Sequence, residues 1–423
     1  MNIRVKEFIR DLAKYTPQYH ATYKALNEEF TINKLRGTIE QAIHDVPFYR
    51  NNRYISFLPA KNDDFSLSKF PILTKNDLSG REKELVSDRF FKFLLRSENT
   101  GGTTGKPLKL YYSPTLSFSR TVYPDMLYKQ YVGKPLQLAL LRGIRPSNGK
   151  LVERVGLHRV VLSSYQLYLD NVDAYINALI DEKITCLLAF PSSITVLAKL
   201  INSKYGKIKI PGLKAIMASS EIFSKENKEI VASVFEGVTL IDYYCMSELA
   251  TAAYSIGLGN YEFNNNYGYA EFVDTGQKTV AGNMIARIIA TSVMNTTMPL
   301  IRYDTGDMAE LDNDGNVVSI IGRSADFVLN KQNELMPCIV LTRNKSLENV
   351  LAFQYYQPRA GALEFHILIN DNFSEENRVS LLEDMINSFP SKVMDCSVVV
   401  KDKLVKSRAG KLIRLLNDRC VNS

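Results

Sequence analysis

A glycine- and threonine-rich run at residues 100–107, TGGTTGKP, has the residue types that hold phosphate groups. A P-loop has the pattern Gly-x4-Gly-Lys-Ser/Thr and leads into a helix. Here Thr100 takes the first glycine position, Pro107 follows the lysine, and a strand-like alternation comes next. The run is not a P-loop, yet its backbone N–H groups, hydroxyls and amine suit phosphate oxygens; the alternative is a flexible polar hairpin. The candidate phosphate-binding residues are Thr100, Gly101, Gly102, Thr103, Thr104, Gly105 and Lys106.

A second candidate segment is MASSEIF, residues 217–223, at the end of an apolar run that is typical of a buried strand. Small residues followed by a carboxylate can wall a flat ring, which makes Ser219, Ser220 and Glu221 candidates for a base-binding site. The alternative is that these residues only form the N-cap region of the next helix.

A third candidate segment, IDYYCMSELA at 241–250, follows another apolar run. The side chains of Asp242, Tyr243 and Tyr244 could pack on a purine, although aromatic residues at a strand end more often fill the core. Ser247 and Glu248 come next, and carboxylate oxygens such as those of Glu248 are the ligands that Mg²⁺ prefers.

A fourth candidate segment is MPLIRYDTGDMAEL, residues 298–311, in which a carboxylate is expected in a turn. Asp307 follows Gly306 between two strand-like runs, and a carboxylate so placed can accept two hydroxyl groups of a ribose. Arg302 and Asp304 in the same segment could equally form a plain ion pair.

Two basic residues complete the candidates. Arg323, in IIGRSADFV at 320–328, is suited to phosphate or ribose oxygens. The segment KDKLVKSRAGKLIR, 401–414, has six basic residues in fourteen, and Lys411 after Gly410 is interpreted as a mobile active-site lysine. The alternative is a solvated basic face; interleaved aromatics, which a single-stranded nucleic-acid site would need, are absent from this segment.

Alternating short apolar runs and amphipathic stretches between 135 and 245 predict βαβ units and a mostly parallel sheet. Open α/β sheets bind ligands at the carboxyl ends of their strands, where the polar segments of this region stand. The pattern further predicts helices over 1–50, ending near Pro47, and a helix that begins at Thr74 with Asp77 in a capping box.

The second half of the chain predicts a β-rich region at 260–325 and a small α+β domain after it. The fold class is therefore α/β, with a large N-terminal domain of mostly parallel sheets plus a β-rich part. We place the domain boundary between 1–325 and 326–423, and expect the smaller C-terminal domain to be mobile.

Composition limits the classes of protein. The 423 residues carry 52 basic and 45 acidic side chains, a net charge of +7 that suits an anionic ligand or a membrane surface but is too diffuse for nucleic acid. The five cysteines form no CxxC pair, which indicates free thiols in a reducing cytoplasm. Neither a secretory signal nor an apolar run of spanning length is evident, so a cytoplasmic location is expected.

In this order, the segments resemble the motifs of the adenylate-forming superfamily of acyl-CoA synthetases, luciferases and peptide-synthetase adenylation domains. Within it the chain is most similar to phenylacetate–CoA ligases and CapK-type proteins of capsular polysaccharide clusters. The matching segments are TGGTTGKP, SSE, DYYCMSE, RYDTGD, GRSAD and SRAGK, and the branch is favoured by FPILTKNDL and FPSS.

The resemblance implies an ATP-dependent ligase that converts a carboxylic acid to acyl-AMP and passes the acyl group to coenzyme A or another acceptor. It assigns the 100–107 run to the β- and γ-phosphates, Glu248 to Mg²⁺, and Asp307 to the ribose. Arg323 would contact ribose or phosphate. Lys411 would bridge the carboxylate and the α-phosphate, and leave when the C-terminal domain rotates about a hinge at Asp326.

Some residues depart from the family pattern. Gly101 stands where serine is common, Cys245 where glycine is usual, and residues 332–334 lack the glycine expected after the hinge. Some relatives have Cys and His residues near the acyl pocket that indicate zinc. Here Cys338 is the first Cys or His after Glu248, so we expect no zinc site.

The acid and the acceptor stay open at this point. Candidate pocket residues lie near Arg142, Ser163–Tyr165, Phe190 and Ala250–Tyr254, and the acceptor could be coenzyme A, a carrier protein or a sugar amine. The chain could function as a monomer or a homodimer. The alternatives to an acyl ligase are an acyl-protein synthetase of the luminescence type and a catalytically degenerate nucleotide-binding scaffold.

Overall fold

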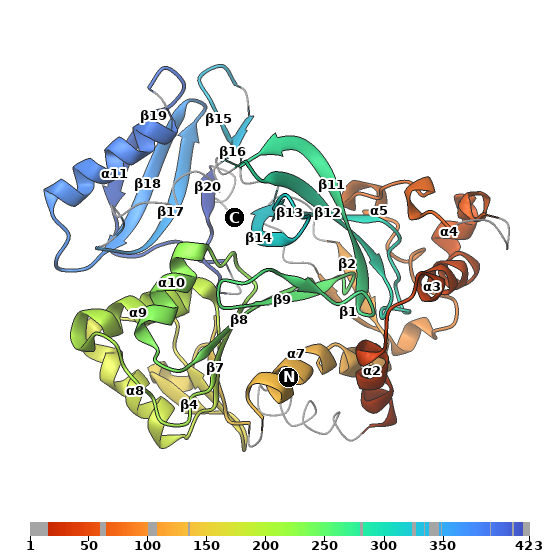
Figure 1. Ribbon diagram of the computed structural model, residues 1–423, viewed down its shortest axis with the longest axis horizontal. Coiled ribbons are helices and arrows are strands. Elements are labelled where there is room, and N and C mark those ends of the chain that lie inside the picture. Colours follow the sequence, from red (N-terminus) through yellow and green to blue (C-terminus); the bar gives the residue numbers. More distant parts are fainter. Residues whose placement is uncertain are drawn as a thin grey trace. The chain divides into compact units, whose positions relative to one another are not determined.

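The computed structural model describes residues 16–59, 65–99, 108–133, 136–279, 282–323, 327–333, 335–337, 347, 349–389, 391–407 and 410–417. The chain divides into two compact units (Figure 1), which are described separately below. Unit 1 comprises 1–134, 243–255 and 259–320, and unit 2 comprises 135–242, 256–258 and 321–423.

Unit 1 begins with the helices α2 (Pro17–Asn27), α3 (Ile32–Asp45) and α4 (Pro47–Asn51). The side chains of Thr16 and Thr31 cap α2 and α3 by accepting a backbone N–H three residues on. Helices are present as predicted in residues 17–51, and the prediction for residues 1–15 lies outside the described residues. Pro47 begins α4 as well as marking the end of α3. A proline suits the first helical position because it has no N–H to leave unpaired.

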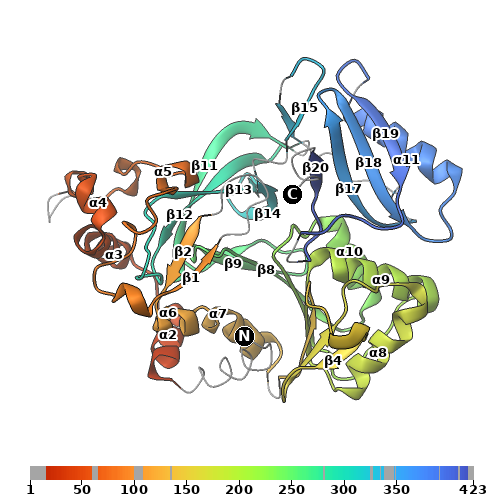
Figure 2. The same ribbon diagram turned by 180° about the vertical axis from the view of Figure 1, so that it is seen from behind.

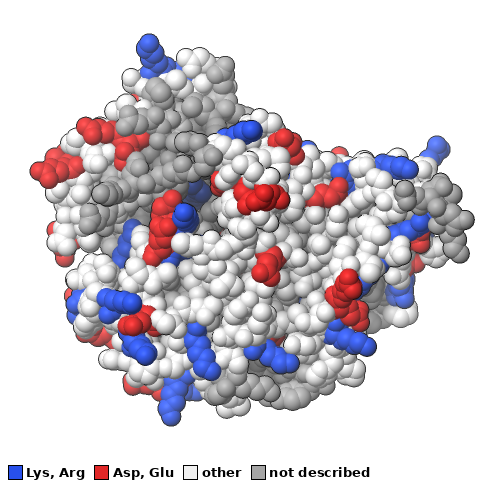
Figure 3. Space-filling model, viewed as in Figure 1, with Lys and Arg blue, Asp and Glu red and all other residues white. Residues whose placement is uncertain are grey.

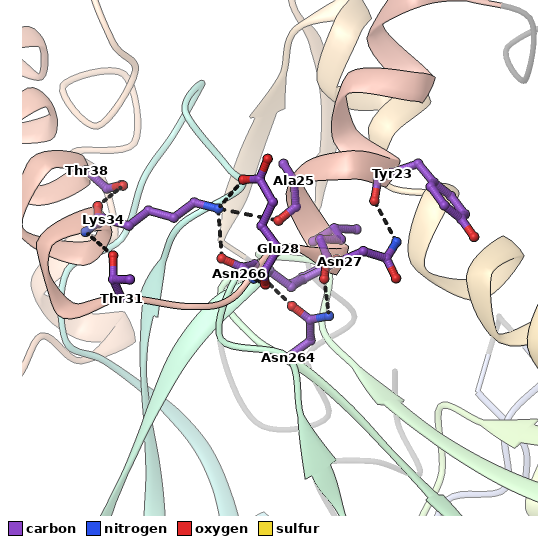
Figure 4. A network of polar contacts seen from close by, with 11 residues as sticks. Tyr23, Ala25, Asn27, Glu28, Thr31, Lys34, Thr38, Asn264 and Asn266 are labelled. Carbon is purple, nitrogen blue, oxygen red and sulfur yellow. Dashed lines mark hydrogen bonds and ion pairs between the residues drawn. The ribbon is translucent and has the colours of Figure 1, made fainter.

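A polar network attaches α2 and α3 to the turn before strand β11 (Figure 4). The Lys34 ammonium donates to Asn266 Oδ1 at 2.7 Å and pairs with Glu28 at 3.7 Å. The side-chain NH₂ groups of the two asparagines bind the end of α2: Asn266 Nδ2 donates to the Glu28 carbonyl at 2.6 Å, and Asn264 Nδ2 donates to the Leu26 carbonyl at 3.1 Å. The helix ends, whose carbonyls lack intrahelical partners, are thus paired with amide side chains.

Short elements connect these helices to the β-rich part of unit 1. Thr74 and Asp77 form the predicted capping box, in which the Asp77 carboxylate accepts the Thr74 N–H at 2.7 Å. The connecting elements are η1 (Tyr54–Phe57), η2 (Leu67–Lys69), α5 (Lys75–Leu78), η3 (Lys92–Leu94), β1 (Arg96–Asn99), β2 (Lys109–Tyr112), α6 (Pro114–Ser119) and α7 (Val122–Tyr131).

The β-rich part is an antiparallel sheet with strand order β11-β12-β13-β14. Apolar residues of β12 and β13, such as Ile288 and Ala309, are fully buried and pack with Tyr261. The strands of this sheet are β11 (Gly268–Lys278), β12 (Met284–Ser292), β13 (Tyr303–Leu311) and β14 (Val317–Arg323). The strands β9 (Ala252–Ile256) and β10 (Glu262–Phe263) pair antiparallel with each other in a different sheet.

The predicted mostly parallel sheet is present: β8-β7-β6-β3-β5-β4 are six consecutive strands of an eight-stranded sheet with the order β10-β9-β8-β7-β6-β3-β5-β4. β3 pairs in parallel with β5 and β6, β6 pairs in parallel with β7, and β4 is an antiparallel edge strand. The elements are β3 (Leu138–Leu141), η4 (Ser147–Gly149), β4 (Val152–Arg154), β5 (Arg159–Leu162), η5 (Leu169–Asn171), α8 (Val172–Asp181), β6 (Cys186–Ala189), α9 (Pro191–Tyr205), β7 (Ala215–Ser219), α10 (Lys225–Val234) and β8 (Thr239–Cys245).

Four of these strands, β3, β5, β6 and β7, are almost wholly buried, because helices such as α8, α9 and α10 pack beside them (Figure 2). This burial explains their continuous apolar sequences, since parallel strands are usually covered on both faces. Their carboxyl ends lead into the loops that begin at Arg142, Ser163, Phe190 and Ser220.

The last part of unit 2 is an α+β arrangement with sheet order β19-β18-β17-β20 and a separate pair, β15 and β16. Its buried core includes Tyr355, Phe365 and Met385. The elements are β15 (Phe327–Leu329), β16 (Leu335–Pro337), β17 (Val350–Arg359), β18 (Ala362–Ile369), α11 (Glu375–Ser388), β19 (Asp395–Val400) and β20 (Leu415–Asn417).

The mixed α/β architecture confirms the predicted fold class. The domain boundary at 325/326 lies outside the described residues and stays a prediction. On the face drawn in Figure 3, Lys and Arg residues are interspersed with Asp and Glu residues. Among the helices of the described part, none combines the length and apolar character needed to cross a membrane.

We expect Gly268→Ala to destabilise unit 1. A Cβ at Gly268, the first residue of β11, would lie 1.7 Å from the Ala250 carbonyl oxygen, so the backbone after β8 would have to move. Overpacking of this kind costs about 1–3 kcal/mol, measurable as a lower midpoint of urea unfolding. The control is Gly37→Ala in α3, where a Cβ meets nothing within 4 Å and the midpoint should not fall. An unchanged midpoint for Gly268→Ala would contradict the close approach.

Candidate functional site

The segment after β7 contains a strained serine. Ser220 has φ +74°, a left-handed backbone conformation that residues other than glycine rarely adopt. Arg142, the first residue after β3, donates from Nη2 to Ser220 Oγ at 2.8 Å, and its guanidinium lies 5.1 Å from the centre of the Phe190 ring. Ser219 Oγ is 3.5 Å from Ser220 Oγ. Loops after β3, β6 and β7 therefore meet around one arginine.

Glu221 connects this cluster to the C-terminal segment of the same unit. Its Oε2 accepts the Ser192 N–H at 3.0 Å, and its Oε1 accepts the Leu412 N–H at 2.8 Å. Burial raises the pKa of the Glu221 carboxyl, and the Ser192 hydrogen bonds, the Leu412 N–H and the Lys411 charge lower it by smaller amounts. The sequence suggested that this carboxylate lines a base; in the structure both its oxygens accept backbone N–H groups.

Lys411 lies on a short paired segment whose described residues are 405–407 and 410–413, which we call the lysine hairpin. Lys406 and Leu412 pair across it, and the Ser407 N–H donates to the Lys411 carbonyl at 2.8 Å. The Lys411 N–H returns a bond to Ser407 Oγ at 3.2 Å, and the Lys411 residue is half-buried. Side chains and backbone within the hairpin thus fix the chain on both sides of Lys411.

Two further contacts hold the lysine hairpin against the loops of the parallel sheet. The Lys406 ammonium donates to the Ser164 carbonyl at 2.8 Å and lies 5.0 Å from the centre of the Tyr165 ring. Burial lowers the pKa of Lys406. Gly410, with φ +77°, is packed so closely that a Cβ would lie 2.3 Å from Gly143 Cα and 2.5 Å from Tyr165 Oη. Only glycine fits this position without movement of its neighbours.

A cavity of about 560 Å³ opens beside the lysine hairpin, a volume within the range of small-molecule sites. Its wall combines the cations Arg145 and Lys406 with the apolar side chains of Val196 and Leu412. The candidate residues Ser164, Tyr165, Ser192 and Ser193 also line it.

Unit 1 contains a second cluster, around Glu248. The Glu248 residue is only 9% exposed, and Tyr303 donates from its hydroxyl to Oε1 at a long 3.4 Å. The Glu248 carbonyl accepts from Asn295 Nδ2 at 3.0 Å, while Leu249 has φ +54°. A single buried carboxylate fits Mg²⁺, which takes few protein ligands and keeps water or phosphate oxygens as the others.

Ser247 is exposed just before Glu248. Its carbonyl accepts the Tyr112 hydroxyl at 2.7 Å, which ties the segment after β8 to β2. Tyr112 and Asn295 were not predicted from the sequence, since they belong to no motif; Tyr303 lies within the RYDTGD segment but was not itself named as a site residue.

Asp307 on β13 accepts the Tyr244 hydroxyl at 2.8 Å. Burial raises the pKa of Tyr244 well above its ordinary value, and the Asp307 charge raises it further, so the phenol stays protonated and donates. The interaction brings two predicted site residues together, from strands 63 positions apart.

The side chains of Asp242 and Tyr243 are buried in the protein interior. Asp242 pairs with Lys228 of α10 at 2.8 Å, and both side chains are 5–6% exposed. Tyr243 is 6% exposed and lies 5.8 Å, between ring centres, from Tyr123. Neither side chain has a described surface free for a purine, so the core alternative accounts for their burial.

Some predicted residues lie outside the described part. The phosphate-loop residues 100–107, the hinge residue Asp326 and the side chain of Arg323 are among them. In the described part of the chain, no group of three or more His, Cys, Asp and Glu side chains has the arrangement of a metal site.

Comparison with known proteins places these features in context. No family model matches the chain. Protein CapK of Staphylococcus aureus is 23% identical over 409 residues, which cover 90% of this chain and 88% of CapK.

Solved structures with a similar fold include two ligases with adenylates bound. The first is a 2-hydroxyisobutyryl-CoA ligase in the postadenylation state with R3-HIB-AMP, with TM-score 0.64, 15% identity, and coverage of 92% of this chain and 89% of that one. The second is the anthranilate CoA ligase AuaEII with anthranoyl-AMP, with TM-score 0.52, 15% identity, and coverage of 75% and 64%.

We expect the Lys228–Asp242 ion pair to be a stability element of unit 2. Asp242→Leu leaves the Lys228 charge buried without its carboxylate, which costs about 3–5 kcal/mol in the free energy of unfolding. The double change with Lys228→Met should recover most of this loss, as measured by urea unfolding.

The matched control is Asp173→Ala, which removes the exposed partner of Lys204 and should change unfolding little. If Asp242→Leu behaved like this control, the buried ion pair would not have the structural role that we assign to it.

Proposed function

Because the chain has the fold of adenylate-forming acyl-CoA ligases and is homologous to a CapK protein, we propose that it is an ATP-dependent acid ligase. It would activate a carboxylic acid as acyl-AMP and transfer the acyl group to an acceptor. The observation that carries the proposal is the fold match over 92% of the chain to a ligase bound to an acyl-adenylate. The separate clusters around Glu248, Asp307 and Lys411 supply residues of the required chemical types.

In the proposed first step, a carboxylate oxygen of the acid attacks the α-phosphorus of ATP. The new O–P bond forms as the bond from the α-phosphorus to the bridging oxygen breaks, and that oxygen leaves with its electron pair as part of pyrophosphate. Both reactants are anions, so catalysis depends on cations and N–H donors that offset the charge repulsion.

The roles follow the chemistry of each group. Glu248 would hold Mg²⁺, which neutralises phosphate charge when bound. Asp307, oriented by the Tyr244 hydroxyl, would accept ribose hydroxyls. Lys411 would neutralise charge between the acid and the α-phosphate. The 100–107 loop and Arg323 would bind the remaining phosphate or ribose oxygens.

Coenzyme A is the acceptor that we propose first, because the solved structures of similar fold are named as CoA ligases. The similarity to CapK favours a role in surface polysaccharide synthesis, in which a carrier protein or a sugar amine would take its place. Rotation of the C-terminal segment about Asp326 would withdraw Lys411 before transfer.

An acyl-enzyme on a cysteine is less well supported. Burial raises the pKa of the Cys186 thiol to about 12 and that of Cys396 to about 11, so both are poor nucleophiles at neutral pH. Cys245 is half-buried beside Tyr243. The described cysteines therefore favour a soluble thiol or amine as acceptor.

Acid-dependent ATP–pyrophosphate exchange is the test of the proposed activity. Purified protein with Mg²⁺ and labelled pyrophosphate is assayed against aryl, fatty, hydroxy and amino acids, with hydroxylamine to trap the adenylate. We expect exchange with one class of acid, and product turnover only after an acceptor is added. Absence of exchange with every acid would contradict the function and favour a catalytically degenerate nucleotide-binding scaffold.

We expect Lys411→Ala to separate the two half-reactions. Loss of one charged transition-state contact costs about 10²–10³ in rate, so acyl-AMP formation should fall by at least that factor. Transfer from supplied acyl-AMP should be retained, because the lysine is not needed after the adenylate has formed.

Lys392→Ala is the matched control, since Lys392 is exposed in the C-terminal part of unit 2, does not line the cavity, and should leave both rates unchanged. Equal loss of both half-reactions in Lys411→Ala would refute the role of Lys411 in adenylation.

A further inference from the structure

Glu221 joins three separate parts of unit 2. It follows β7, it accepts the Ser192 N–H at the start of α9 at 3.0 Å, and it accepts the Leu412 N–H of the lysine hairpin at 2.8 Å. Each bond uses a different carboxylate oxygen, so the side chain is held at both ends of its polar group.

The residue that Glu221 holds is the neighbour of Lys411. Consecutive Cα atoms are held about 3.8 Å apart, so the position of the Leu412 backbone restricts where the Lys411 backbone can lie. Lys406 and Gly410 also contact the sheet loops, at Ser164 and at Gly143. Those contacts lie before Lys411 in the chain, whereas the bond to Glu221 holds the chain just after it.

The surroundings of Glu221 favour a side chain that holds two segments together by hydrogen bonds over one that only contributes surface charge. A buried carboxylate is costly unless hydrogen bonds compensate it, and two N–H donors supply that compensation here. Charge-assisted hydrogen bonds of this kind are stronger than neutral ones. Withdrawal of the lysine hairpin would leave one carboxylate oxygen in need of another donor.

We propose that Glu221 is a positioning residue for acyl-AMP formation, which fixes the Leu412 N–H and thereby places Lys411. This inference rests on the function proposed above. A misplacement of about 1 Å at a reacting group can cost 10²-fold in rate, so loss of the tether should slow adenylation although Lys411 itself is intact. Transfer of the acyl group should not need the tether.

The primary variant is Glu221→Ala, which removes both acceptor oxygens. Glu221→Gln keeps one carbonyl oxygen and places an NH₂ group opposite the second N–H, so its effect should be smaller. The matched control is Glu229→Ala on α10, which makes the same chemical change at an exposed glutamate.

The first measurement is amide hydrogen exchange of residues 410–417 in the ligand-free protein. Loss of a hydrogen bond to a charged group should speed exchange at Leu412 by at least about tenfold in Glu221→Ala, with no change in Glu229→Ala. A direct role of Glu221 at the adenine base alone would leave this exchange unchanged, which would overturn the proposal.

The second measurement compares the half-reactions. We expect ATP–pyrophosphate exchange to fall about 10–100-fold in Glu221→Ala, less in Glu221→Gln, while transfer from supplied acyl-AMP stays within about twofold. An equal fall in both half-reactions together with a lower melting temperature would indicate only a structural role and overturn the proposal.

The two proposals can fail separately. An inactive wild-type protein would contradict the proposed function, whereas unchanged Leu412 exchange in an active Glu221→Ala enzyme would contradict only the role of Glu221.

Discussion

A carboxylate that is wholly or partly withdrawn from water needs hydrogen-bond donors within the protein, and three carboxylates of this chain show how the fold supplies them. Asp242 has the Lys228 ammonium, Glu221 has two backbone N–H groups, and Asp307 has the Tyr244 hydroxyl. These partners differ in how readily the interaction can be broken. An ammonium on a neighbouring helix stabilises one fold permanently, whereas a backbone N–H on a hairpin can be given up if that hairpin moves.

Backbone strain also occurs near candidate site residues. Ser220, Leu249 and Arg302 have positive φ and lie within five residues of a candidate site residue, whereas the other described non-glycine residues with positive φ, Arg53, Asn148, Lys183 and Asn333, do not. Such conformations persist only where surrounding contacts impose them. At Arg302 the side chain supplies those contacts, through Glu271 at 3.0 Å and the carbonyls of Ser68 and Phe70. At Arg302, just before β13, a strained backbone and a buried ion pair therefore occur at the same residue.

Much of the fold could be predicted, because local patterns reflect burial directly. The continuous apolar runs at β3, β5, β6 and β7 match strands covered on both faces, and Thr74 with Asp77 forms the predicted capping box. Local sequence patterns predicted less of the candidate site. Asp242 and Tyr243 have suitable chemistry for a nucleotide, but their burial depends on Lys228 and Tyr123, which lie 14 and 120 positions away. No spacing rule connects residues that far apart.

The sequence by itself determined the order of the elements, the α/β class and the types of chemical group that follow each strand. These depend on hydrophobic periodicity and turn chemistry, which act over a few residues. Only the tertiary structure decided what each polar group contacts: that Glu221 accepts the Leu412 N–H, and that Asp307 accepts the Tyr244 hydroxyl. The reason is geometric, because hydrogen bonds need atoms within about 3 Å, and that proximity arises only when distant segments pack together.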